Sequence, residues 1–127
     1  MPDVYKKQFT PQEANKRLPL VKQIVEDILV KGQQLKDIIA QSPAGTELSA
    51  YGLEIQSEIQ DLMKELEALG CFYKDWNFEV GLVDFPGMID GHPVFLCWRS
   101  DEQDIRFFHS IDEGYNSRKV IPPHYLN

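Results

Sequence analysis

The change in composition and periodicity at Gly70 constrains the fold of this chain more than any other feature. Three of the fourteen aromatic residues precede residue 71, and eleven follow it. The first half is rich in Leu, Ile, Lys, Glu and Gln, which favour helices, whereas aromatic enrichment favours strands. Apolar residues recur every three or four positions before Gly70 and alternate after it. The sequence therefore predicts an α+β fold, with a helical part followed by a sheet.

The first helix has a strong start signal. Thr10 is placed as its N-cap, Pro11 occupies the first helical position, and Glu13 closes a capping box. Pro19 lies too far into the helix for the first turn. We therefore expect it to kink the helix, or to end a short helix at about Arg17 so that a second one starts at Pro19.

Two long helices are expected to form an antiparallel hairpin over residues 9–70, because only a short Pro/Gly loop at 42–45 separates them. Thr46 or Ser49 can cap the second helix, and Gly70 is placed to end it. The weak helix former Asn15 is expected to hydrogen-bond the backbone at Leu18–Pro19. The apolar face of the first helix comprises Val21, Ile24, Ile28, Leu35 and Ile38. The coiled-coil-like seam of the second comprises Leu48, Tyr51, Ile55, Ile59 (or Glu58), Leu62, Leu66 and Leu69.

Residues 71–119 are expected to form a small antiparallel β-meander, followed by an extended tail at 120–127, within a single domain of residues 1–127. A two-residue turn at Asp90–Gly91 would pair Val83 with Trp98 and Asp84 with Cys97. A four-residue turn at 100–103 would pair Trp98 with Ile105 and Leu96 with Phe107.

These two turns sort the side chains onto two faces of the sheet. The face expected to meet the helices carries Val83, Phe85, Val94, Leu96, Trp98, Ile105, Phe107 and His109. The other, mixed face carries Leu82, Asp84, Phe95, Cys97, Arg99, Asp104, Arg106 and Phe108. In this register Asp84, Cys97 and Arg106 form one row, with Phe95 and Phe108 beside them.

Composition excludes several classes of function. The formal net charge is −7 and no long cluster of Lys and Arg exists, which argues against nucleic-acid binding. No apolar run approaches the roughly 20 residues of a membrane span, and the start has no signal-peptide character, so we expect a cytoplasmic protein. Cys71 and Cys97 are then expected to be reduced thiols.

The motifs of the chain resemble those of a family of bacterial proteins, domain of unknown function 2203. They are an FTPQEANKRLPLV helix start at residues 9–21, GLVDFP at 81–86 and LCW at 96–98. Glu102 in the following turn, His109 at the end of the next strand, and a Gly114, Tyr115, Arg118 signature complete them. One departure is Phe108, where the family pattern has Trp. The resemblance implies no activity.

A metal site for zinc or iron could draw on Asp84, Cys97, Glu102 and His109. The predicted register argues against it, because it places Cys97 and His109 on opposite faces, so no cofactor is expected. Nucleophilic catalysis by Cys97 would need an imidazole beside it, and the register supplies Asp84 and Arg106 instead. There is no phosphate-binding Gly-rich loop, GxSxG or HExxH motif.

We therefore expect a non-enzymatic interaction or regulatory module that forms a homodimer through the hairpin, because the seam of the second helix is longer than the meander can cover. Its mixed face would bind a protein partner or a small ligand through Asp84, Cys97, Glu102, Arg106 and Arg118, unless the tail with Ile121 and Tyr125 covers that face. The alternative is a metal- or small-ligand-binding enzyme built around Asp84, Cys97, Glu102, His109 and Arg118.

Overall fold

A helical hairpin packed on a five-stranded antiparallel sheet makes up the computed structural model, which describes residues 8–126. The hairpin consists of α1 (Pro11–Gln41) and α2 (Ala50–Leu69). The sheet consists of β1 (Phe72–Tyr73), β2 (Leu82–Ile89), β3 (His92–Arg99), β4 (Phe107–Ser110) and β5 (Lys119–Val120), in that spatial order. The predicted α+β class is confirmed. Within the described residues, no helix has the length and apolar character needed to cross a membrane. Residues 1–7 lie outside the described part, and most of the segment expected to lack signal-peptide character is among them.

The predicted start of α1 is confirmed. The Thr10 side-chain oxygen accepts a hydrogen bond from the Glu13 backbone N–H at 3.1 Å, and the Glu13 carboxylate accepts one from the Thr10 N–H at 3.0 Å. The helix then continues through Pro19, so the expected end at Arg17 is wrong. Pro19 lies on the exposed side of α1, and its neighbour Leu18 is buried in the core.

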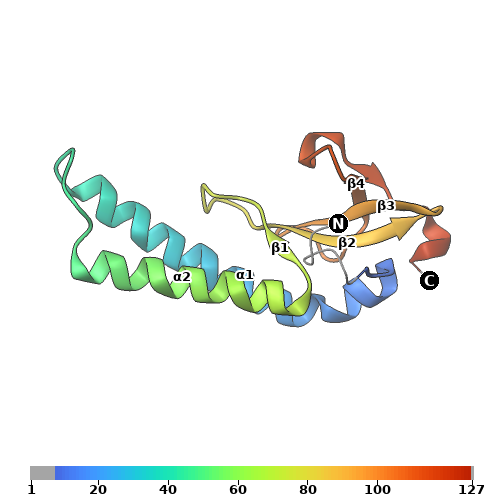
Figure 1. The fold of residues 1–127 in the computed structure, drawn as a ribbon, viewed down its shortest axis with the longest axis horizontal. Coiled ribbons are helices and arrows are strands. Elements are labelled where there is room, and N and C mark those ends of the chain that lie inside the picture. The colour runs from blue at the N-terminus through green and yellow to red at the C-terminus, as the bar shows by residue number, and fades with distance from the viewer. Residues whose placement is uncertain (1–7, 127) are drawn as a thin grey trace.

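The second helix is capped by Ser49, whose side chain accepts from the Gly52 N–H at 3.1 Å, and it ends at Gly70 with a left-handed φ of 96°. Of its predicted seam, Ile55, Ile59 and Leu66 are buried within the single chain, whereas Tyr51 is 60% exposed. The far end of the hairpin extends beyond the sheet (Figure 1). The homodimer stays a prediction, although much of the seam that suggested it is buried inside one chain.

One core cluster joins α1, α2 and one face of the sheet. Gly81 lies just before β2 and very near α1. A Cβ atom at this position would be 2.2 Å from the Val25 side chain. Phe9, just before α1, donates its N–H to the Pro86 carbonyl at 2.8 Å, and its ring meets Phe85 edge-on. The strands contribute Val83, Phe85, Ile89, Val94, Leu96 and Trp98 to this core.

The predicted β2–β3 register is confirmed. Val83 lies opposite Trp98, and Asp84 lies opposite Cys97. The two turn residues Asp90 and Gly91 have φ values of 51° and 78°, as a two-residue turn of this kind requires. Trp98 is 1% exposed, so its predicted place in the core is also confirmed.

The predicted β3–β4 register is wrong by one residue. Leu96 lies opposite Phe108 rather than Phe107, and Phe95 lies opposite His109. The connection is longer than the expected four-residue turn and spans residues 100–106. Because side chains alternate along a strand, a shift of one residue exchanges the faces of all β4 side chains.

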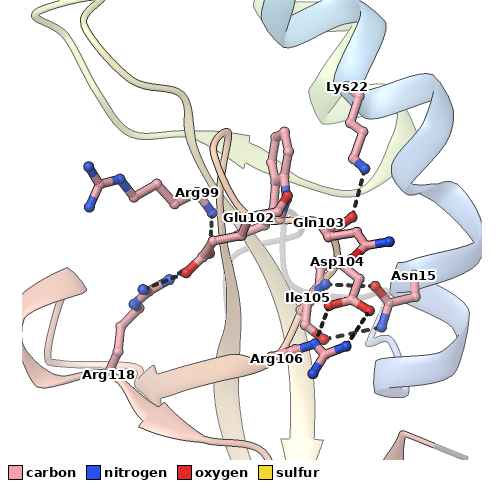
Figure 2. Close-up of polar contacts among 10 residues, drawn as sticks. Asn15, Lys22, Arg99, Glu102, Gln103, Asp104, Ile105, Arg106 and Arg118 are labelled. Atoms are coloured by element: carbon pink, nitrogen blue, oxygen red, sulfur yellow. Dashed lines mark hydrogen bonds and ion pairs between the residues drawn. The ribbon is translucent and has the colours of Figure 1, made fainter.

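A hydrogen-bonded clamp from α1 accounts for this register. The Asn15 amide donates to the Ile105 carbonyl at 3.2 Å and accepts from the Ile105 N–H at 2.8 Å (Figure 2). Lys22 holds the same loop by donating to the Gln103 carbonyl at 2.7 Å. Ile105 is fully buried, and its backbone is bound to a helix side chain instead of a neighbouring strand. The expected Asn15 contact with Leu18–Pro19 is therefore wrong.

The segment predicted as an extended tail is partly structured. β5 crosses its boundary, since it pairs Val120 with Phe107 and Lys119 with Phe108. Ile121 is fully buried in the helix-side core, and its N–H donates to the Arg106 carbonyl at 2.8 Å. A short 3-10 turn, η3 (Pro123–Tyr125), follows it. The buried part of the tail therefore serves the core and not the mixed face.

Candidate functional site

The one-residue shift of β4 brings three metal-ligating side chains together on the sheet face that points away from the hairpin core. Asp84, Cys97 and His109 are 5%, 2% and 3% exposed. Their ligand atoms all lie within 4.8 Å of one another. His109 Nε2 is 3.1 Å and 3.2 Å from the two carboxylate oxygens of Asp84. The expectation that Cys97 and His109 lie on opposite faces is therefore wrong.

The other imidazole nitrogen of His109 has a fixed role. Nδ1 lies 2.8 Å from the Ser110 carbonyl oxygen, which can only accept, so Nδ1 carries a hydrogen. Nε2 then faces Asp84 either with a second proton or with a lone pair that needs a cation. Hydrogen bonding to Asp84 raises the pKa of His109, and burial opposes this rise. The carboxylate side of the ring is thus suited to a positive charge.

Cys97 is not an activated nucleophile in this arrangement. Burial, together with the charge of Asp84, raises the pKa of its thiol to about 12, and Arg118 opposes the shift. A Cys–His–Asp relay needs one ring nitrogen for the thiol and the other for the carboxylate. Here Ser110 occupies Nδ1, and Asp84 occupies Nε2. The geometry therefore fits convergent ligands and does not fit a relay.

Arg118 and Glu102, both predicted as site residues, form a bidentate ion pair beside Cys97, with distances of 2.9 Å and 2.7 Å. The Glu102 carboxylate also accepts from the Arg99 N–H at 2.8 Å (Figure 2). The Arg118 guanidinium lies over the rings of Phe107, at 4.1 Å, and Tyr115, at 4.5 Å. These contacts hold a largely buried cation rigidly at the edge of the site.

Three residues predicted for the mixed face lie elsewhere. Asp104 and Arg106 are both outside β4, in the connection over residues 100–106, where they pair with each other (Figure 2). Phe108 is turned toward the helix-side core, and Phe107 takes the place expected for it. All three errors follow from the shifted register.

A pocket of about 350 Å³ adjoins the three ligands. Sequence reasoning missed most of its wall, because Lys74 follows β1 and Glu113 follows β4 in connections whose paths are set by tertiary packing. Tyr115 belongs to the Gly114, Tyr115, Arg118 motif, but the motif by itself does not indicate a role in a pocket. The complete lining is Lys74, Leu82, Asp84, Phe95, Cys97, His109, Ile111, Glu113, Gly114 and Tyr115.

The donor set suits zinc or ferrous iron, both of which accept thiolate, imidazole and carboxylate ligands. Bonds of about 2.0–2.3 Å place the donor atoms of a tetrahedral site roughly 3.3–3.8 Å apart. The pair of His109 and Asp84 already approaches this spacing. The largest separation, within 4.8 Å, exceeds it by at most about 1 Å, so the Cys97 sulfur would move by about this amount when a metal binds. A backbone carbonyl on the second imidazole nitrogen is also a common partner of a metal-bound histidine.

Comparison with known proteins identifies the family. The family model described as an uncharacterized conserved protein, DUF2203, matches residues 7–121. The chain belongs to the DUF2203 family. No curated protein and no solved structure matches it. The matched range includes Asp84, Cys97 and His109.

Proposed function

We propose that this protein binds a divalent transition-metal ion, zinc or ferrous iron, through Asp84 carboxylate, Cys97 thiolate and His109 Nε2. The observation that carries the proposal is the convergence of three buried ligand atoms within 4.8 Å while Ser110 holds the remaining imidazole nitrogen. The Asp84 carboxylate and His109 Nε2 face each other at 3.1 Å, and a cation bound between them would take over both contacts and add the Cys97 sulfur.

A bound metal ion would also neutralise the negative charges of the Cys97 thiolate and the Asp84 carboxylate. Burial and the Asp84 charge disfavour a Cys97 thiolate in the absence of a cation, as the thiol pKa of about 12 indicates. A coordinating divalent ion deprotonates a thiol. Arg118, whose charge lowers the pKa of the Cys97 thiol, adds a second positive charge to this side of the site. Metal binding therefore accounts for the placement of a thiol next to a carboxylate.

This proposal takes the alternative of a metal-binding site in preference to a non-enzymatic interaction surface on the same face. Asp84 and Cys97 are too deeply buried to contact a protein partner directly. A pocket of about 350 Å³ lies at the lower end of the size range of small-molecule sites. The proposal does not require catalysis, and a homodimer through the hairpin remains compatible with it.

The test is metal binding by protein that is purified without a polyhistidine tag and stripped with a chelator. Zinc affinity is measured by competition with a chromophoric chelator, and cobalt(II) is used to detect a thiolate-to-metal charge-transfer band. We expect one metal per chain. Cys97→Ser and His109→Gln should each weaken binding by more than the roughly 10–100-fold that loss of a supporting partner costs.

Cys71→Ser is the matched control, because Cys71 is also buried, its sulfur donates to the Leu66 carbonyl at 3.5 Å, and it does not line the pocket. This variant should keep the zinc affinity and the cobalt band of the parent. Asp84→Asn preserves the shape of the third ligand and tests it without a cavity. Circular dichroism establishes that each variant is folded. Zinc binding that is absent from the parent, or unchanged in folded Cys97→Ser, would show that the proposal is wrong.

A further inference from the structure

The pocket beside the three ligands contains features that the metal proposal leaves unused. A zinc ion with three protein ligands keeps one position for water or substrate. Asp84, Cys97 and His109 all line the 350 Å³ pocket, so an open position of the bound ion would face it. The identity of a ligand that could occupy this position depends on the remaining wall residues. This inference rests on the proposed function.

Lys74 supplies a positive charge to the pocket wall. Its ammonium lies over the Phe95 ring, 5.7 Å from the ring centre. The same Phe95 ring centre is 5.6 Å from that of His109. Within the described residues, Lys74 forms no ion pair with a carboxylate. Lys74 and His109 therefore neighbour the same aromatic ring and line the same pocket.

Tyr115 supplies a second donor. Its oxygen accepts a hydrogen bond from Arg99 Nη1 at 2.7 Å, which leaves the hydroxyl hydrogen free to point to another acceptor. Glu113 is the other charged wall residue outside the three ligands, and its pKa is lowered chiefly by Ser110 and Ser117. The donors around the open metal position therefore favour an anionic ligand.

The rest of the wall is apolar and limits the size of that ligand. Leu82, Phe95 and Ile111 line the pocket together with the charged groups. We propose that the pocket binds a small organic acid, with its carboxylate between the metal ion and Lys74 and its short hydrocarbon part against Leu82 and Ile111. The hydroxyl of Tyr115 donates to the same carboxylate.

The experiment titrates the cobalt(II)-loaded protein with acetate and then with butyrate, and follows the visible absorption bands of the metal. We expect both acids to change the spectrum to saturation. Butyrate should bind roughly tenfold more tightly than acetate, the gain expected when two further methylene groups are buried. Lys74→Gln should weaken both acids about tenfold and leave the affinity for cobalt unchanged.

Lys64→Gln is the matched control, because Lys64 is an exposed lysine of α2 that does not line the pocket. It should bind both acids like the parent. If cobalt binds and neither acid changes its spectrum, or if Lys74→Gln binds both acids like the parent, the organic-acid inference is wrong while the metal site stands. If cobalt and zinc do not bind at all, both proposals fail.

Discussion

The two connections of β3 to its neighbours show how differently local and distant residues control a strand register. Between β2 and β3, the Asp90–Gly91 turn contains both residues that set the pairing, and each has the positive φ that the turn requires. Between β3 and β4, the pairing depends on Asn15, which lies 90 residues away from the Ile105 backbone that it holds. The first register follows from local sequence, and the second follows from the fold.

The difference matters for function because the second connection decides the site. With a four-residue turn, His109 would face the helices and Arg106 would lie beside Cys97. With the observed seven-residue connection, His109 lies 3.1 Å from Asp84, and Arg106 is in solvent. One residue of register therefore separates a row of paired charges from a set of metal ligands.

The largest effect on stability is expected at Trp98 of β3, which contacts both β2 and the connection to β4. Trp98 lies opposite Val83 of β2, and its Nε1 donates to the carbonyl of Glu102, in the β3–β4 connection, at 3.0 Å. Because the side chain is 1% exposed, Trp98→Ala should lower the free energy of unfolding by about 3–5 kcal/mol in a denaturant titration. Trp76→Ala is the control, since Trp76 is 66% exposed. Equal losses from the two variants would contradict the assigned core.

An intermediate effect is expected at the clamp. Asn15→Leu leaves the Ile105 N–H and carbonyl without their helix partner, so the free energy of unfolding should fall by about 2 kcal/mol. Lys16→Leu, at the next and exposed position, should change it by less than about 0.5 kcal/mol.

Hydrogen exchange sharpens this prediction. The Ile105 amide should lose its protection in Asn15→Leu, while amides of the β2–β3 hairpin such as that of Trp98 keep theirs. Unchanged protection at Ile105 would show that the clamp does not control the second register.

The smallest effect concerns the local turn. Gly91 has a φ of 78° and open space around its Cα, so Gly91→Ala introduces backbone strain without a steric clash. The free energy of unfolding should fall by about 1 kcal/mol. Gly114→Ala is a matched control, because Gly114 also has open space but a φ of −136°. Thermal unfolding of the two variants should distinguish them, and a Gly114→Ala loss as large as that of Gly91→Ala would contradict backbone strain as the cause.

Much of the fold was predictable because its signals are local. The Thr10–Glu13 capping box, the Gly70 helix end and the Asp90–Gly91 turn each rely on residues within a few positions of one another. The continuation of α1 through Pro19 was not predictable in this way, since it depends on which side of the helix becomes buried.

The candidate site was predictable only in its chemistry. Asp84, Cys97, Glu102, His109 and Arg118 were recognisable as candidates by residue type, and the row of Asp84 and Cys97 followed from the first turn. Lys74 and Glu113 carried no signal, because each lies in a connection without a motif.

The sequence by itself determined the helical hairpin, the order of the three central strands and the first register, because short-range hydrogen bonds and backbone preferences specify them. The tertiary structure alone decided that His109 meets Asp84 and Cys97. The physical reason is that strand side chains alternate with a period of two, so the face of β4 depends on how many residues the preceding loop contains. That number is set by the two hydrogen bonds through which Asn15, on a distant helix, removes Ile105 from the sheet.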